Sequence, residues 1–466
     1  MNAVLIAATA AVPALSTAYA GAWSGGFGPG YWTAKDVETR RAYRAGVRIR
    51  RGWKPLARRL RLVLRDVPRP SHGGPAQPGK IHTPKMRRLK ADEFGVTADF
   101  QLCPTIRLED FQANAADLRN AWNMVRVAVE QTEPNKVTVR AVRRDPLRVK
   151  TAYAPSGTAP DLRHYVAGLD AFGREARIRL HHGSGLCVYG LPNYGKTSFI
   201  LGLITHLAPS DSVQFLVADG KSTLGTDGDY MDVAPRALSV IGDDIYTFNQ
   251  LVRELETMRQ MRAATIRQAL GVRNFWDVGP SPEWPLIMFI VDEAHTYFEQ
   301  TSAYGNPETQ QRNAVAADNA ARVAGLVRKC QAVGILPVLT TQKGTSDAIP
   351  SMISANAHAS ACFAVKTDEA AQAALGPDIH RHSDQSPISL QHEDFVGVMT
   401  MLADHRAGYT QVRTPYCAES VAAQVCEQYA HLVRSEVVPS ISVGMDHRAF
   451  AADGGDAVIA SLLAKS

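Results

Sequence analysis

The residues of this chain whose types and spacing most clearly suggest chemistry are at positions 190–197. They read Gly-Leu-Pro-Asn-Tyr-Gly-Lys-Thr and match the pattern G-x-x-x-x-G-K-[ST] at every fixed position. The two glycines let the backbone turn tightly, so that successive N–H groups point at phosphate oxygens. Lys196 is expected to reach the β- and γ-phosphates of a nucleoside triphosphate, and the Thr197 hydroxyl is expected to ligate Mg²⁺.

The surroundings of this motif agree with a phosphate-binding loop. The apolar run Leu186–Tyr189 before it is typical of a strand. The apolar run Ser198–Leu207 after it is typical of a helix, whose positive end would face the same site. The pattern therefore predicts ATP and Mg²⁺ as ligands. The residues expected to contact the nucleotide are Gly190, Leu191, Pro192, Asn193, Tyr194, Gly195, Lys196, Thr197 and Ser198.

An acidic pair after another apolar run supplies the matching catalytic chemistry. Asp292 directly follows Leu286–Val291, so we expect it at the carboxyl end of a buried strand, where it would act as a second Mg²⁺ ligand. Glu293 is then placed to polarise the attacking water as a general base. A strand that ends in Asp-Glu is often only structural, but its position after a phosphate-binding loop favours the functional interpretation. His295 could orient Glu293, although a surface position on a helix is the preferred interpretation.

Two further polar groups follow predicted strands. Gln342 comes after Ile335–Thr340, where its amide is expected to sense the γ-phosphate and to contribute to catalysis. The sequence Asp219-Gly220-Lys221 stands at the tip of the strand after the phosphate-loop helix, near the same edge of the sheet. Whether it contacts nucleotide, DNA or only neighbouring residues is left open.

Short apolar strands alternate with helices from Gly185 onward, which is typical of a parallel sheet buried on both faces. We therefore predict an α/β fold of the RecA-like P-loop NTPase type with a mainly parallel sheet. The expected strands are Leu186–Tyr189, Val213–Ala218, Leu286–Val291, Ile335–Thr340 and Ala361–Val365.

A small α/β module is expected before this core. Helical periodicity runs over Glu109–Val129, and strand-like alternation runs over Lys136–Val142. Val166–Leu180 has the pattern of a hairpin. At the other end, Glu419–Val433 is expected to form one closing helix.

The N-terminal part of the chain combines an apolar run with a basic one. Val4–Ala20 is open to three interpretations: a secretory signal peptide, a membrane anchor, or a frayed end. We favour the anchor, because the basic stretch that follows would hold the rest of the chain on the cytoplasmic side. That stretch carries eleven Lys and Arg residues between Arg40 and Arg65 and no acidic one. It suits the phosphates of nucleic acid or of anionic lipid, and a solvated linker is the alternative.

Composition sets the remaining bounds. The hydrophobic fraction of 45% and charged fraction of 21% are those of a soluble globular protein rather than a disordered one. The six cysteines are scattered without metal-ligand spacing, which favours a reducing compartment and predicts no structural metal. The expected divisions are a membrane anchor at 1–25, a basic juxtamembrane segment and linker at 26–90, the module and hairpin at 91–184, the ATPase core at 185–415, and a C-terminal helix and tail at 416–466.

The order of these pieces resembles the FtsK/SpoIIIE family of double-stranded-DNA translocases. Gly271–Phe275 resembles the "GVRNI" of that family, and Ala332–Ile335 followed by Thr340–Lys343 resembles "AAGIHLVLATQRP". Ile353–Asn356 resembles "IKAN", and Asp219-Gly220-Lys221 resembles an Asp-x-Lys motif. The likeness covers about residues 185–415. Within the family, the segments before the phosphate loop are most similar to actinomycete plasmid-transfer proteins of the TraB/TraSA type.

This resemblance implies a homo-hexameric, membrane-associated, ATP-driven motor that moves double-stranded plasmid or integrative-element DNA, together with other transfer proteins, on the cytoplasmic side of a bacterial membrane. Two departures matter. Gln331, Ser360 and Ala364 stand where the family usually has arginine, so the arginine lent to a neighbouring site is unassigned. The family's DNA-reading winged helix has no counterpart among the C-terminal residues. The candidates for that arginine are Arg259, Arg322 and Arg328.

Two other functions share the same core. One is a P-loop ATPase that energises protein secretion, for which a peptide would replace DNA as the stimulating substrate. The other is a membrane-tethered scaffold that uses ATP only to assemble. The substitution Glu293→Gln distinguishes a motor from a scaffold, because it should abolish transport by a motor and leave the function of a scaffold intact.

Overall fold

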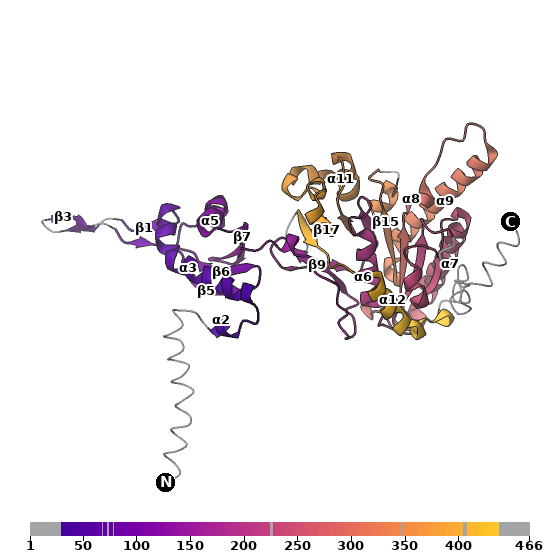
Figure 1. Ribbon diagram of the computed structural model, residues 1–466, viewed down its shortest axis with the longest axis horizontal. Coiled ribbons are helices and arrows are strands. Elements are labelled where there is room, and N and C mark those ends of the chain that lie inside the picture. The colour runs from indigo at the N-terminus through magenta and orange to yellow at the C-terminus, as the bar shows by residue number, and fades with distance from the viewer. Residues whose placement is uncertain are drawn as a thin grey trace, which may run out of the picture. The chain divides into compact units, whose positions relative to one another are not determined.

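The computed structural model describes residues 29–67, 69–71, 74–77, 79–223, 227–345, 348–403 and 408–437. The chain forms two compact units, residues 1–146 with 172–174 and residues 147–171 with 175–466 (Figure 1). The apolar run Val4–Ala20, on which the expected membrane anchor depends, lies outside the described residues. Within the described residues, no helix is both long and apolar enough to cross a bilayer.

The first unit is an antiparallel sheet with helices packed on one face. Its strands lie in the order β5-β6-β8-β7. Alternate residues of β6 and β8 point into one core, which also receives the apolar side of α3 and residues of α4 and α5. The bounds are α3 (Val37–Arg59), β5 (Lys85–Ala91), β6 (Gly95–Gln101), α4 (Leu108–Ala113), α5 (Ala115–Trp122), β7 (Arg126–Glu133) and β8 (Lys136–Val142). The shorter elements are α2 (Pro29–Thr33), β1 (Leu64–Arg65), β2 (Arg69–Ser71), β3 (Gly74–Gln77) and β4 (Ile81–His82).

The structure departs from the predicted module in two places. The single helix expected over Glu109–Val129 is two helices, α4 and α5, separated at Asn114. Helix α5 ends at Trp122, because Asn123 takes a left-handed backbone conformation (φ 54°) and the chain then turns into β7. The basic stretch expected within a juxtamembrane segment and linker is helix α3. Its buried residues recur every three or four positions, so one side of the helix packs on the sheet.

The second unit contains a ten-stranded sheet in the order β10-β9-β18-β17-β16-β11-β15-β14-β12-β13. The pairs from β16 to β13 are parallel, and those from β17 to β10 are antiparallel. The parallel strands are β11 (Leu186–Tyr189), β12 (Val213–Asp219), β13 (Ala237–Ile241), β14 (Leu286–Asp292), β15 (Ile335–Thr341) and β16 (Ala359–Cys362). The antiparallel strands are β9 (His164–Asp170), β10 (Glu175–Arg179), β17 (Val398–Leu402) and β18 (Tyr409–Arg413).

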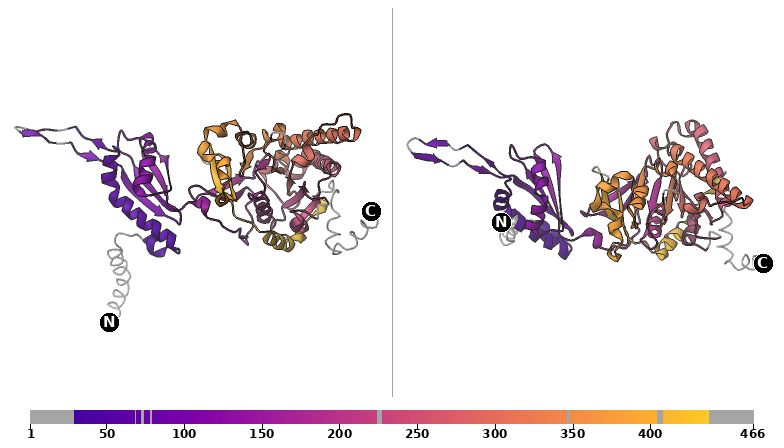
Figure 2. Two further views of the ribbon diagram at one scale, coloured as in Figure 1. Left: turned by 45° about the horizontal axis from the view of Figure 1, so that its top comes forward. Right: turned by 90° about the horizontal axis from the view of Figure 1, so that it is seen from above.

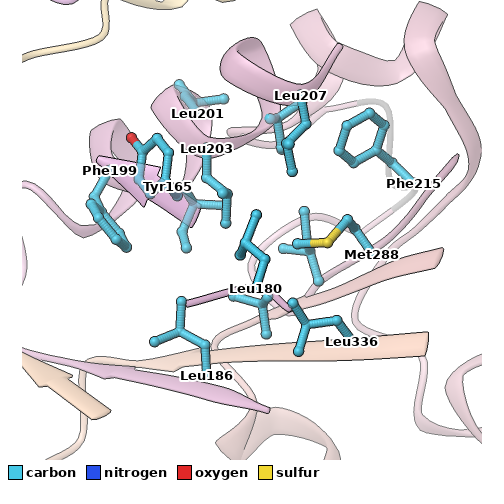
Figure 3. Close-up of a cluster of buried hydrophobic side chains, with 14 of the residues drawn as sticks. Tyr165, Leu180, Leu186, Phe199, Leu201, Leu203, Leu207, Phe215, Met288 and Leu336 are labelled. Atoms are coloured by element: carbon cyan, nitrogen blue, oxygen red, sulfur yellow. The ribbon is translucent and has the colours of Figure 1, made fainter. Parts of the chain in front are cut away.

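Helices cover both faces of this sheet (Figure 2). On one face, leucines of α6 (Lys196–Leu207) meet strand residues such as Leu186, Met288 and Leu336 (Figure 3). The helix α12 (Glu419–Gln428) belongs to the same core. On the other face lie α7 (Ile245–Leu270), α9 (Pro307–Lys329) and α11 (Asp368–Leu375).

This architecture confirms the predicted fold class. All five predicted strands exist, although β16 covers Ala359–Cys362 rather than the predicted Ala361–Val365. The Val166–Leu180 hairpin is present as β9 and β10. The predicted closing helix ends at Gln428 and is followed by a turn of 3₁₀ helix over Ala430–Leu432. The sequence did not predict β13, β17 or β18.

Candidate functional site

The residues 190–195 form the loop between β11 and α6, at the carboxyl edge of the parallel strands. Gly190 (φ +145°) and Gly195 (φ +104°) take backbone conformations that residues with a side chain rarely adopt, and Asn193 is left-handed (φ 65°). A Cβ atom on Gly190 would lie 2.6 Å from the Cβ of Phe363. The loop therefore needs glycine at both ends, and α6 begins at Lys196 as a phosphate-binding helix should.

Lys196 is almost fully buried beneath this loop. Its ammonium donates to the carbonyl oxygens of Gly190 at 2.8 Å and Leu191 at 3.3 Å. Burial lowers the pKa of Lys196 to about 8, and the charges of Glu293 and Asp292 oppose that shift. The side chain is thus held at the loop, close to the acidic pair, by bonds that phosphate oxygens can replace.

Glu293 is held in a fixed orientation by two donors. Its Oε2 accepts from the backbone N–H of Gln342 at 3.1 Å and lies 3.2 Å from Nδ1 of His295. Burial alone raises the pKa of Glu293, but these two hydrogen bonds and the charges of Lys196 and Lys221 outweigh it, so the pKa lies below its usual value. The carboxylate is therefore ionised at neutral pH, as a general base must be.

Backbone geometry also marks Glu293 as a special position. Its φ of 47° lies in the left-handed region, which a non-glycine residue occupies only when the surroundings enforce it. His295 is not the surface residue that the sequence analysis preferred, because the structure places its ring against the Glu293 carboxylate.

Asp292 ends β14 with its side chain 1% exposed. One carboxylate oxygen accepts from the hydroxyl of Thr340. Within the described residues the other oxygen, Oδ2, has no hydrogen-bond partner, and the ammonium of Lys221 lies 3.5 Å away. Burial raises the pKa of Asp292, and the charge of Lys221 counters that shift. A buried, unpartnered oxygen at this edge of the sheet is suited to a cation ligand.

The sequence Asp219-Gly220-Lys221 brings a second carboxylate and one ammonium to the same place. Asp219 is the register partner of Asp292 in neighbouring strands. Burial raises its pKa to about 6, and the charges of Asp292 and Asp229 add to that shift. The Lys221 ammonium lies 3.1 Å from Oδ2 of Asp229 and 3.8 Å from Oε1 of Glu293. Burial lowers the pKa of Lys221, but the negative charges of Asp292, Asp229 and Glu293 raise it by more. The pKa of Lys221 therefore lies above its usual value.

A cavity of about 490 Å³ opens over the loop and Lys221. Of the predicted site residues, five are not in its wall: Gly190, Leu191, Tyr194, Asp292 and Glu293. The Tyr194 hydroxyl instead donates to the carbonyl of Gln391. The side chain of Ser198 bonds the backbone of Cys417. The predicted residues that do line the cavity are Pro192, Asn193, Gly195, Lys196, Thr197, Ser198 and Gln342.

Sequence reasoning missed the opposite wall of the cavity. It is formed by residues 150–151, 396–397 and 413–419, and the parallel bridge between Ala152 and Tyr416 holds the first and last of these segments together. No motif marks them, because they are distant in sequence from each other and from the loop. The lining residues on this side are Lys150, Thr151, Val396, Gly397, Arg413, Thr414, Tyr416, Cys417 and Glu419.

The carboxylate oxygens beside the Lys221 ammonium, from Asp229 at 3.1 Å and Asp292 at 3.5 Å, suit Mg²⁺. The Thr197 hydroxyl lies 3.5 Å from Oδ2 of Asp229, and the unpartnered Oδ2 of Asp292 faces the same side as Lys221. Across the described ranges, no group of three or more His, Cys, Asp or Glu side chains could hold a metal alone. Magnesium would therefore take most of its ligands from phosphate and water, which is its usual behaviour.

The three candidate arginines differ in their surroundings. Arg322 bonds the carboxylates of Glu256 and, at 2.8 Å, Asp318, so its guanidinium is already committed. Arg328 is exposed and Arg259 is half-buried. Unlike Arg322, neither Arg259 nor Arg328 pairs with a carboxylate within the described residues.

The phosphate loop, the acidic pair and the strand order together decide the class of fold. The chain has a P-loop NTPase fold. No protein-family model matches it, and no curated protein matches it.

Several solved structures are similar to the chain. The pCW3 conjugation coupling protein TcpA, in a monomer form with ATPgS, is 14% identical with a TM-score of 0.49, over 74% of this chain and 94% of that one. EssC (ATPases 2 and 3) from Geobacillus thermodenitrificans is 15% identical with a TM-score of 0.45, over 63% of this chain and 52% of that one. The DNA-packaging ATPase B204 from Sulfolobus Turreted Icosahedral Virus is 11% identical with a TM-score of 0.27, over 50% and 98%.

These three structures are all described as ATPases or as bound to an ATP analogue. They include a conjugation coupling protein and a DNA-packaging ATPase. At such identities and TM-scores, they carry neither a residue role nor a substrate over to this chain.

Proposed function

We propose that this chain is an ATPase that translocates double-stranded DNA, acting as a homo-hexamer on the cytoplasmic side of a bacterial membrane during transfer of a plasmid or integrative element. The observation that carries the ATPase part is the convergence of Lys196, Asp292 and Glu293 at one end of the parallel strands. The DNA part rests on the order of motifs that resembles the FtsK/SpoIIIE family.

The described geometry supports a hydrolysis mechanism. The loop N–H groups and Lys196 bind the β- and γ-phosphates, and Lys196 exchanges its two carbonyl partners for phosphate oxygens. Glu293 accepts the proton of the attacking water, with its orientation fixed by His295 and by the Gln342 N–H. When bound, Mg²⁺ would be held by Thr197 and Asp292 and would neutralise charge that develops on the phosphates.

Two of the segments that resemble the family contribute to the core rather than to the site. The ring of Phe275 lies against Gly334, where an added Cβ would come within 2.8 Å of it. Arg262 donates to the carbonyl oxygens of Val333 and Gly334. These contacts explain why the two segments occur together. They do not by themselves indicate that the chain binds nucleic acid.

The test is ATP hydrolysis by the full chain with and without duplex DNA, beside Lys196→Ala as the background. We expect duplex DNA to stimulate hydrolysis and added salt to weaken that stimulation, because phosphate contacts release counterions. Equal rates with and without saturating duplex would overturn the DNA part of the proposal. Hydrolysis stimulated by a secretion-signal peptide, and not by DNA, would favour the secretion alternative.

A further inference from the structure

Helix α3 of the first unit has two halves with different roles. The buried half carries Ala42, Ala45, Ile49, Trp53 and Ala57, which recur at helical spacing and pack on the sheet. The opposite half is basic and exposed. It carries Arg40, Arg41, Arg44, Arg48, Arg50, Arg51, Lys54, Arg58 and Arg59.

The packing of α3 fixes which half faces solvent. The Trp53 ring lies 4.5 Å from Phe100 and 5.9 Å from Phe111, between ring centroids, and its Nε1 donates to the carbonyl of Pro84 at 2.6 Å. Gly46 approaches Leu89 so closely that a Cβ would lie 2.6 Å from its Cδ2. The helix cannot rotate without breaking these contacts, so the basic half stays exposed.

The basic half is not neutralised by the surrounding protein. Glu38 is the one carboxylate on the helix, and it pairs with Arg41 at 2.6 Å and with Arg143. Arg40 donates to the carbonyl of Ala34 and Arg44 to the hydroxyl of Tyr31, and within the described residues five further basic side chains have no carboxylate partner. These are Arg48, Arg50, Lys54, Arg58 and Arg59.

The spacing of these charges costs stability. Arg40, Arg44 and Arg48 follow one another at intervals of four, and so do Arg50, Lys54 and Arg58. Like charges at this spacing destabilise a helix by about 0.2–0.5 kcal/mol per pair. The packing of α3 on the sheet does not require this repulsion between like charges, and a bound polyanion would reduce it.

The neighbouring edge strand β5 is also basic. Helix α3 lies against β5, whose Lys85, Arg87, Arg88 and Lys90 are all exposed. Basic residues on an edge strand also prevent unwanted strand pairing, so β5 alone would not indicate a ligand. Lys85, Arg88 and Lys90 are the register partners of Gln101, Asp99 and Thr97, on the sheet face away from the core that α3 covers, so they do not extend the basic half of α3.

We propose that the exposed basic half of α3 binds the phosphate backbone of duplex DNA independently of sequence. The 23-residue helix spans about 34 Å, which is about one helical turn of duplex DNA. Eight of its nine cations are arginine, whose planar guanidinium bonds phosphate through two parallel N–H groups. The inference rests on the proposed function only for the choice of cargo.

A lipid surface fits the helix less well. Helices that bind at a membrane interface bury their apolar side among the acyl chains. The apolar side of α3 is already used against Phe100 and Phe111. Val37 in the first turn is its one exposed large apolar side chain, which is too little for insertion.

The experiment measures binding of a fluorescein-labelled blunt duplex to the full chain by anisotropy, without nucleotide and across a salt series. The test variant is Arg48→Gln with Arg58→Gln. The matched control is Arg107→Gln with Arg119→Gln, which removes two exposed arginines from the same unit away from α3. Circular dichroism melts establish that both variants fold.

We expect the test variant to bind about tenfold more weakly and to lose about 2 from the slope of log affinity against log salt, because each phosphate contact contributes about 0.9. The control should match the wild type. Wild-type affinity and slope in the test variant would overturn the proposal. It would equally fail if the two changes lowered co-sedimentation with phosphatidylserine-containing vesicles and left DNA binding unchanged.

This experiment tests DNA binding by α3 separately from DNA-stimulated ATP hydrolysis. If DNA fails to stimulate hydrolysis but binds through Arg48 and Arg58, the proposed function falls and the surface stands. If the test variant keeps both DNA binding and full DNA-stimulated hydrolysis, the surface falls and the proposed function stands.

Discussion

The ammonium of Lys221 lies 3.5 Å from the unpartnered Oδ2 of Asp292, at the position where a cation would complete the site. The same ammonium bonds Asp229 at 3.1 Å and lies 3.8 Å from Glu293. Together with the nearby Lys196, Lys221 places positive charge among the carboxylates of Asp219, Asp229, Asp292 and Glu293. It therefore holds the acidic residues together when no Mg²⁺ is bound.

Replacing Lys221 with Met should destabilise the chain in EDTA more than in Mg²⁺. Breaking a buried ion pair costs about 3–5 kcal/mol, but the Lys221 side chain is 34% exposed, so solvent screening reduces the expected loss to about 1–2 kcal/mol. Magnesium should recover part of that loss by neutralising Asp292. Urea unfolding in each buffer measures both effects.

The control for this prediction is Lys343→Met, which removes an ammonium from an exposed pair with Glu299. It should cost below about 1 kcal/mol and show no dependence on Mg²⁺. Equal stability of Lys221→Met in EDTA and in Mg²⁺ would mean that Lys221 does not stand in for the metal.

Lys196→Met should abolish ATP binding while raising the stability of the nucleotide-free chain. Burial depresses the folded-state pKa of Lys196 to about 8, below its usual value of 10.5. Below pH 8 the protonated Lys196 side chain therefore destabilises the folded state. Its removal should add about 1–3 kcal/mol to the free energy of unfolding at pH 7.

The pH dependence of Lys196 has a defined sign. Between pH 8 and 10.5 the unfolded chain holds the proton and the folded chain does not, so the wild type gains stability as pH rises. Lys196→Met should lack that gain. Urea unfolding of both proteins at pH 7 and pH 9.5 measures the difference, and parallel slopes would contradict the prediction.

The sequence was most informative where one local motif does one task. The loop at 190–197 and the pair Asp292-Glu293 could be predicted because the backbone turn and the strand end need particular residues in a row. The pattern also predicted the parallel strands, since each is a continuous apolar run. The role of Lys221 was left open, because its partners come from three separate segments.

The parts that the sequence could not predict depend on contacts between distant segments. The cavity wall at 413–419 meets residues 150–151 only through tertiary folding. Strand β7 was assigned to a helix because Val125 and Val129 also fit helical spacing, and only the left-handed turn at Asn123 separates the two. Helix α3 was hidden because its many arginines obscured a regular apolar stripe.

Glu293→Gln should lower the rate of ATP hydrolysis by about 10²–10⁴ and leave ATP binding intact. Glutamine keeps an oxygen for the Gln342 N–H but cannot take a proton from water. Single-turnover hydrolysis and binding of a fluorescent ATP analogue measure the two properties separately. A variant that still hydrolyses ATP near the wild-type rate would remove Glu293 from the role of base.

His295→Ala should slow hydrolysis without changing ATP affinity, because His295 acts through Glu293. Its Nδ1 lies 3.2 Å from the Glu293 carboxylate and 3.4 Å from the Thr341 hydroxyl. Loss of that hydrogen bond leaves burial less opposed, so the pKa of Glu293 rises and the carboxylate protonates at a higher pH.

The acidic limb of the kcat–pH profile should therefore move to higher pH in His295→Ala, with kcat at pH 7 reduced about tenfold and KM within a factor of about two. His295→Asn is the matched variant, because its side-chain amide can still donate to Glu293, and it should restore most of kcat and of the wild-type profile. A merely structural role for His295 would lower the amount of folded enzyme and leave the shape of the profile unchanged. An unshifted acidic limb would thus show that His295 does not set the protonation of the base.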